Sequence, residues 1–158
     1  MFYTVNFPIL ILDLIIGANM TEQAALLEKI PTRISNSEIV TLVNKININW
    51  KYLRLFKEYT SVKDDTISDW LNINVRTLRN YRKYEINFKD NIKEQLILLF
   101  SLFKHGSEVF GNVEDFSNWL HSENFFFDKK APVSYLNTET GIRLVDDRLT
   151  AMEYGDNV

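Results

Sequence analysis

The chain has 158 residues, of which 46% are hydrophobic and 25% are charged, with 18 Lys and Arg against 21 Asp and Glu. This length and composition suit a globular protein of one compact domain or two small ones. The sequence has no cysteine, which excludes disulfide frameworks and thiolate metal sites and is consistent with a cytoplasmic protein, and its 5 Gly and 3 Pro favour long helices over a turn-rich sheet.

The first 34 residues form a predicted N-terminal extension. Residues 7–16 (FPILILDLII) are apolar apart from Asp13, but they are too few to span a bilayer, and no Lys or Arg precedes them as in a secretory signal. One interpretation is an ordered strand or helix packed on a partner. The other is that Met20 is the true start and that residues 1–19 are a disordered extension.

Four short helices are predicted between residues 35 and 83. Residues 35–46 have Ser35 or Ser37 as N-cap and an apolar face at helical spacing, and residues 49–59 repeat the pattern. A third helix lies in 60–71, where Thr66 and Asp69 have capping-box spacing. The fourth begins after Asn74, a good N-cap.

Longer helices are predicted in the second half. Residues 92–111 form one that ends at Gly111, and its segment 96–103 (LILLFSLF) is apolar almost all round, as in a helix buried on every side. We expect this segment to be central core, with part of its surface shared in a dimer. Further helices cover 112–122, a short segment from Pro132, and 139–154 after the cap Thr138. No strand is expected after residue 20, so the predicted fold class is all-α.

The third and fourth helices have the pattern of a helix-turn-helix. Ser68 is the small residue where the helices cross, and Asn72 tolerates the left-handed conformation that the turn requires. The apolar contacts between the helices would come from Ile67, Leu71, Ile73, Leu78 and Tyr81. The pattern predicts a DNA-binding domain over residues 35–90.

A cationic stretch, NINVRTLRNYRK at residues 72–83, coincides with the second of these helices. Arg pairs with guanine and Asn with adenine in the major groove, and further cations meet phosphates. The nearby Asp64, Asp65 and Asp69 dilute this charge, and an ordinary solvated helix face is the alternative. The predicted DNA-binding residues are Asn74, Arg76, Thr77, Arg79, Asn80 and Lys83.

Residues 107–155 carry a set of short motifs in a fixed order. They are VFGN, then WL in the next helix, then Pro132 followed by YLNTETG, and finally Val145, Leu149 and EYG at helical spacing. Together they resemble the toxin-binding domain of Xre/MbcA/ParS-type antitoxins, with a looser likeness back to about residue 38. Gly106 in the long helix and Asn72 in the turn depart from the family pattern.

The resemblance implies a bacterial type II toxin–antitoxin pair. In the Xre branch the partner is typically a RES-domain toxin that consumes NAD, which the antitoxin binds and inhibits, and the complex commonly represses its own operator DNA. A dimer is expected for reading a palindrome. The predicted domains are therefore residues 35–90 for DNA and residues 91–158 for the toxin.

The toxin-binding part is acidic, with six Lys and Arg against eleven Asp and Glu in residues 91–158. An NAD-consuming site must hold a pyrophosphate and should be positive, so charge complementarity favours association. We expect the last helix and tail to cover the toxin's active site, so that deleting residues 153–158 weakens inhibition. Any single acid here is equally explained as solvated helix surface. The predicted partner-binding residues are Asp146, Asp147, Leu149, Glu153, Tyr154 and Asp156.

Residues 124–130 (NFFFDKK) place three Phe in a predicted loop. Either one of them anchors a partner, or the loop folds back over the core.

Catalytic chemistry finds no support in the sequence. His105 and His121 have no neighbouring ligand or triad pattern, and no Gly-rich phosphate loop is present. We therefore expect no enzyme activity, cofactor, metal or small-molecule substrate. The alternatives to an antitoxin are a dimeric helix-turn-helix transcription regulator without a toxin partner, whose C-terminal part dimerises or senses a small molecule, and an interaction protein that has lost DNA binding.

Overall fold

The computed structural model describes residue 17 and residues 22–155. The chain divides into two units, Met1–Ile30 and Pro31–Val158, and each is considered by itself. In the first unit, residues 22–28 are helical. The two interpretations of residues 7–16 and of a start at Met20 concern positions outside those described.

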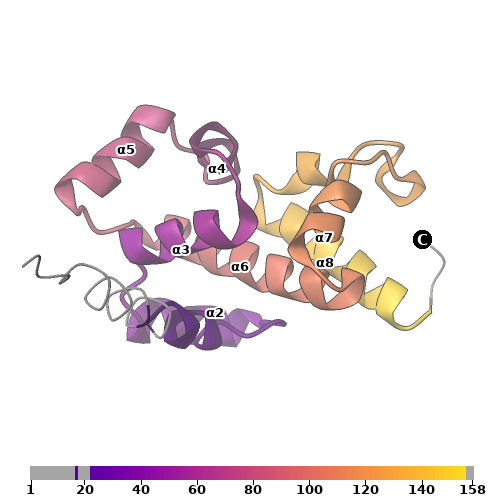
Figure 1. Cartoon of the computed structure of the whole chain (residues 1–158), viewed down its shortest axis with the longest axis horizontal. Coiled ribbons are helices and arrows are strands. Elements are labelled where there is room, and N and C mark those ends of the chain that lie inside the picture. Colours follow the sequence, from indigo (N-terminus) through magenta and orange to yellow (C-terminus); the bar gives the residue numbers. More distant parts are fainter. Residues whose placement is uncertain (1–16, 18–21, 156–158) are drawn as a thin grey trace, which may run out of the picture. The chain divides into compact units, whose positions relative to one another are not determined.

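The second unit is built from helices (Figure 1). Its described residues contain no strand, only an isolated antiparallel bridge between Asn124 and Lys130. No helix in the described part of the chain is long and apolar enough to cross a bilayer. The all-α prediction is confirmed. The elements are α2 (Asn36–Lys45), α3 (Trp50–Thr60), α4 (Asp64–Trp70), α5 (Val75–Tyr84), α6 (Asp90–Phe110), α7 (Val113–Leu120), the 3-10 turns η1 (Phe125–Phe127) and η2 (Pro132–Tyr135), and α8 (Glu139–Glu153).

The long helix α6 is the centre of this unit. It packs against α2, α3, α7 and α8 (Figure 1), and all eight residues from 96 to 103 are buried. A helix that is apolar all round needs neighbours on every side, and here one chain supplies them. The prediction of a central core segment is confirmed. Sharing it with a second copy is wrong, because these side chains are already covered.

Aromatic side chains join α6 to its neighbours. The Phe56 ring of α3 meets Phe100 and Phe103 edge-on, with centroids 4.9 and 5.3 Å apart. Phe103 in turn meets Phe116 of α7 at 5.2 Å. Such pairs contribute about 0.5–1.5 kcal/mol each beyond the burial of their area. The cluster therefore fixes how α3 and α7 sit on α6.

The helix ends are mostly as the sequence predicts. Ser35 caps α2 in a full capping box, and its side-chain hydrogen bond lowers the pKa of Glu38. Asn74, Asn112 and Thr138 cap α5, α7 and α8, and Gly111 ends α6 with φ 86°.

The predicted capping box at Thr66 and Asp69 is wrong. Helix α4 begins one turn earlier, at Asp64, and its N-cap Lys63 makes no side-chain capping bond. Asp64 and Asp65 occupy the first turn, where carboxylates interact favourably with the helix dipole. Asp64 also forms an ion pair with Lys57 of α3. These charges stabilise the helix start that the spacing pattern placed too late.

Candidate functional site

Helices α4 and α5 are joined by a tight turn at Asn72. Asn72 has φ 52°, the left-handed conformation that the sequence predicts there. The Ile73 amide donates to the Ser68 carbonyl at 3.0 Å, and the Asn74 side chain accepts from the Thr77 amide at 2.7 Å. Ser68 itself is 1% exposed, so a small side chain is needed where the helices meet. These bonds set the angle at which α5 leaves the turn.

The two helices share an apolar contact. Ile67, Leu71 and Leu78 are buried, and Ile73 is half-buried. Tyr81 is buried and lies edge-on to Phe88, which precedes α6, with centroids 4.8 Å apart. The apolar residues of the predicted motif therefore have the packing roles expected of them. They hold α5 against α4 on one side and against Phe88 on the other.

The opposite face of α5 is polar and cationic. Arg76, Arg79 and Lys83 are exposed at helical spacing, together with the cap Asn74, while Thr77 and Asn80 are half-buried beside them. Arg82 lies 5.5 Å over the Trp50 ring of α3. The pairing of Asp64 with Lys57 neutralises one of the three acids near this face. Asp65 and Asp69 stay exposed, so this pairing offsets only part of the nearby negative charge.

Asn72 has a second role that the sequence does not reveal. Its side-chain amide donates to the Asn137 carbonyl at 2.6 Å, just before α8. The Gln95 amide of α6 donates to the carbonyls of Trp70 and Leu136 at 3.2 and 3.1 Å. A glycine at position 72 would adopt the same φ but would lack this tether. The departure from the usual turn residue therefore links the helix pair to the start of α8.

A second candidate region comprises the C-terminal half of α6 with α7, η1, η2 and α8. Gly106 lets α7 approach α6, because a Cβ at this position would stand 2.4 Å from the Phe116 ring. Phe116, Trp119 and Phe127 continue the aromatic contacts outward, with neighbouring centroids 6.0 and 6.2 Å apart. Gly106, the other departure from the family pattern, thus has a packing reason.

A polar cluster around the buried His105 holds α8 on α6. His105 is 1% exposed, and its Nδ1 donates to Asp146 Oδ1 at 2.6 Å. Its Nε2 lies 3.5 Å from both Glu153 and Arg33, and Arg33 forms an ion pair with Glu153. The buried His105 ring thus has polar partners on both nitrogens, as burial of a polar group requires, whereas Arg33 and Glu153 are exposed. The cluster is a structural clamp that contacts α8 at Asp146 and at Glu153, about two turns apart.

The predicted partner-binding residues fall into different environments. Leu149 is fully buried, so its prediction as a contact residue is wrong. Its helical spacing places it on the apolar face of α8, which packs into the core. Asp146 and Glu153 are engaged in the clamp around His105. Asp147 is exposed, and Tyr154 is 80% exposed. Asp156 lies outside the described residues.

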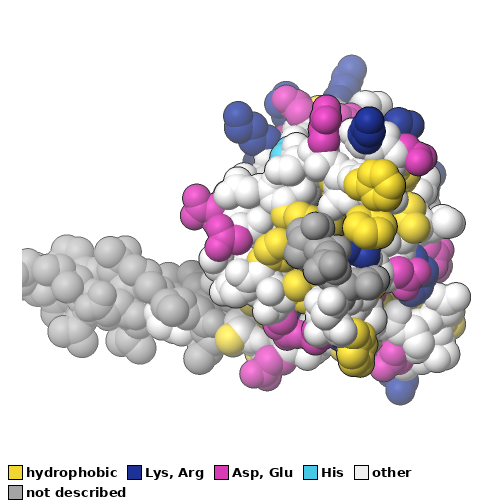
Figure 2. Space-filling model, turned by 90° about the vertical axis from the view of Figure 1, so that its right-hand side faces the viewer, with side chains coloured by type: hydrophobic (Ala, Val, Ile, Leu, Met, Phe, Trp, Pro, Cys, Tyr) yellow, Lys and Arg dark blue, Asp and Glu magenta, His cyan; other side chains and the backbone are white. Residues whose placement is uncertain are grey.

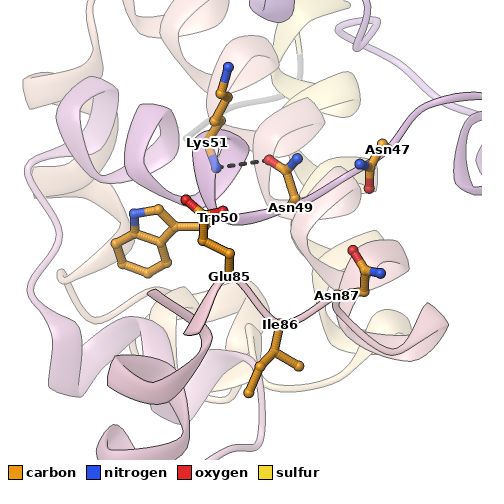
Figure 3. A pocket seen from close by; sticks show the side chains of 7 residues that line it. All are labelled: Asn47, Asn49, Trp50, Lys51, Glu85, Ile86 and Asn87. Carbon is orange, nitrogen blue, oxygen red and sulfur yellow. Dashed lines mark hydrogen bonds between the residues drawn. The ribbon is translucent and has the colours of Figure 1, made fainter. Parts of the chain in front are cut away.

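A pocket of about 290 Å³ lies between the start of α3 and the segment joining α5 to α6 (Figure 3). Three of its seven lining residues are asparagines, and the Asn49 side chain accepts a hydrogen bond from the Lys51 amide at 2.9 Å. This lining provides no nucleophile paired with a base. The pocket therefore does not indicate catalysis. Its residues are Asn47, Asn49, Trp50, Lys51, Glu85, Ile86 and Asn87.

Comparison with known proteins identifies the second region. Residues 105–155 match the family model of the antitoxin Xre/MbcA/ParS C-terminal toxin-binding domain. No curated protein matches the chain significantly. The resemblance drawn from the sequence motifs is confirmed over this stretch. The match supports an antitoxin role, a toxin as protein partner, and a regulatory rather than enzymatic protein.

Proposed function

We propose, from the toxin-binding domain at residues 105–155, that this chain is the antitoxin of a type II toxin–antitoxin pair and acts in the cytoplasm. Its partner is a RES-domain toxin that consumes NAD, and its helix pair α4–α5 represses its own operon. The family match is the observation that carries the antitoxin role. The choice of a RES-domain toxin rests on the likeness to the Xre branch.

The charge of the toxin-binding part supports this partner. Residues 105–155 contain nine Asp and Glu against four Lys and Arg. A toxin that binds NAD has a positive site for the pyrophosphate, and opposite charges raise the rate and specificity of association. Of the acids predicted to meet it, Asp147 is exposed and lies outside the His105 clamp, and Tyr154, which ends α8, is 80% exposed. We propose that these two residues face the toxin.

The operator contact is proposed for the cationic face of α5. Arg76 and Arg79 are exposed, one turn apart, and form no ion pair with any other described residue. The rest of this face consists of Asn74, Thr77, Asn80 and Lys83. A homodimer would place two such helices on a palindrome. Because residues 96–103 of α6 are covered within one chain, we place the dimer contact outside this segment.

Replacing both Arg76 and Arg79 by alanine is expected to weaken operator binding by about a hundredfold or more, since each bidentate Arg–guanine pair contributes about 1–3 kcal/mol. Binding would be measured by fluorescence anisotropy on the promoter DNA of the operon. Arg76→Lys with Arg79→Lys keeps the charge and loses the bidentate geometry. It should retain non-specific binding and lose discrimination between operator and random DNA.

Lys129→Ala with Lys130→Ala is the matched control, because it removes the same charge from exposed residues outside α5. It should leave operator affinity unchanged. If the Arg76→Ala, Arg79→Ala protein binds the operator as tightly as wild type, the DNA-binding assignment is wrong. If the wild-type chain binds operator but no toxin, the function is instead that of a helix-turn-helix regulator without a toxin partner.

A further inference from the structure

Three consecutive phenylalanines in η1 have different environments. Phe127 is buried, with its ring 6.2 Å from Trp119 and 5.4 Å from Tyr135. Phe125 is 81% exposed and Phe126 is 52% exposed. A 3-10 turn has three residues per turn, so consecutive side chains point in different directions and cannot share one core. One ring therefore anchors the loop, and two stand outward.

The loop that presents these rings is fixed by its own backbone. The Asn124 amide donates to the Lys130 carbonyl at 3.2 Å, the Lys129 amide donates to the Asn124 carbonyl at 3.0 Å, and the Asn124 side chain accepts from the Phe126 amide at 2.9 Å. Asp128 and Lys129 both have positive φ, 53° and 62°, which non-glycine residues adopt at a cost. A preformed loop loses little entropy when it binds, which favours affinity.

Helix α8 adds further side chains beside the exposed rings of η1. The Arg148 guanidinium lies 3.4 Å from the centre of the Phe126 ring, and Arg148 is itself buried. Leu144, one turn before Arg148, is 46% exposed. Figure 2 shows hydrophobic side chains gathered on this end of the chain, with acidic and basic side chains around them. Single exposed apolar residues are ordinary, but a rigid group of them marks an interaction site.

We propose that Phe125, Phe126 and Leu144, here called the aromatic edge, are the apolar centre of the toxin-binding surface. They would insert into an apolar recess of the toxin that is rimmed by positive charge. This inference rests on the proposed antitoxin function. Aromatic residues with Arg behind them are typical of the few contacts that dominate a protein interface.

The matched toxin-binding domain and its net negative charge favour the toxin over other occupants. All three residues lie within 105–155, the stretch that matches this domain, and the stretch contains nine Asp and Glu against four Lys and Arg. A second copy of this chain would bring the same negative charge to the contact, and an anionic lipid surface would be repelled as well. A protein with a positive rim, as an NAD-consuming toxin needs, is the complementary partner.

The test is the affinity of the full chain for the toxin encoded next to it, measured by isothermal titration calorimetry. Phe125→Ser with Phe126→Ser should weaken binding about thirtyfold or more, as expected for hot-spot residues. Leu144→Asp, a second variant on α8, should weaken it in the same direction. Val40→Ser with Ile86→Ser is the matched control, because both residues are exposed and apolar but lie outside the matched domain. It should bind like wild type.

The outcomes separate the two claims. Wild-type affinity in both aromatic-edge variants overturns this inference and leaves the antitoxin function standing. A wild-type chain that binds no toxin overturns the antitoxin function and the inference with it. If the variants keep toxin affinity and instead reduce self-association in analytical ultracentrifugation, the aromatic edge is a contact between copies of this chain, and the inference is wrong.

Discussion

Replacing Gly141 by alanine is expected to lower the free energy of unfolding by about 3 kcal/mol or more and to impair toxin binding. A Cβ at this position would stand 1.9 Å from the Tyr135 carbonyl oxygen and 2.8 Å from the Thr138 hydroxyl, which caps α8. The first contact is with backbone, which no rotamer change can move. Overpacking of this kind typically costs about 1–3 kcal/mol even when side chains can yield.

Thr140→Ala is the matched control, because Thr140 is exposed in the same helical turn and should change stability by less than about 0.5 kcal/mol. Chemical denaturation followed by circular dichroism measures both variants. A Gly141→Ala protein as stable as wild type would show that η2 does not pack on the start of α8. The junction matters for function because η2 and the cap of α8 lie in the matched domain.

Gly106→Ala is expected to have the second-largest effect, a loss of about 2 kcal/mol. Its Cβ would meet three atoms of the Phe116 ring at 2.4–2.5 Å. The ring cannot withdraw, because it is fully buried between Phe103 and Trp119. The higher helix propensity of alanine offsets about 1 kcal/mol of the overpacking cost.

A double-mutant cycle with Phe116→Leu makes this prediction specific. Leucine removes the ring atoms that the new methyl group would strike, so the two changes together should cost less than the sum of the separate losses. Strict additivity in denaturation experiments would contradict the close contact of α6 and α7. Gly111→Ala is the control for a glycine-to-alanine change without a steric clash. No atom lies within 4 Å of the added Cβ, and only the left-handed backbone, φ 86°, opposes the change.

Local patterns in the sequence predict most of this fold. Four helix caps each accept a hydrogen bond from the amide three positions ahead, so spacing alone reveals them. They are Ser35, Asn74, Asn112 and Thr138. The buried segment at 96–103 follows from its uniform apolarity. The predicted start of α4 is too late because Asp64, at the true start, is stabilised by the helix dipole and by an ion pair with Lys57. The ion pair is a tertiary contact, which spacing along the sequence does not reveal.

The candidate sites depend more on contacts between distant residues. The clamp joins Arg33 to residues of α6 and α8 that are more than seventy positions away, so nothing in the sequence shows that Asp146 and Glu153 are engaged. The tether from Asn72 to Asn137 is equally non-local. In contrast, the exposed phenylalanines of η1 were open to prediction, because three adjacent aromatic residues in a short loop cannot all be buried.

The most direct test of the antitoxin function is expression of the toxin encoded next to this chain, alone and together with the full chain, with cellular NAD measured over time. We predict that the toxin alone depletes NAD and stops growth, and that co-expression preserves NAD and yields a complex that copurifies. Depletion of NAD at the same rate in both cultures, with no copurifying complex, would contradict the proposal that this chain neutralises an NAD-consuming toxin by binding it.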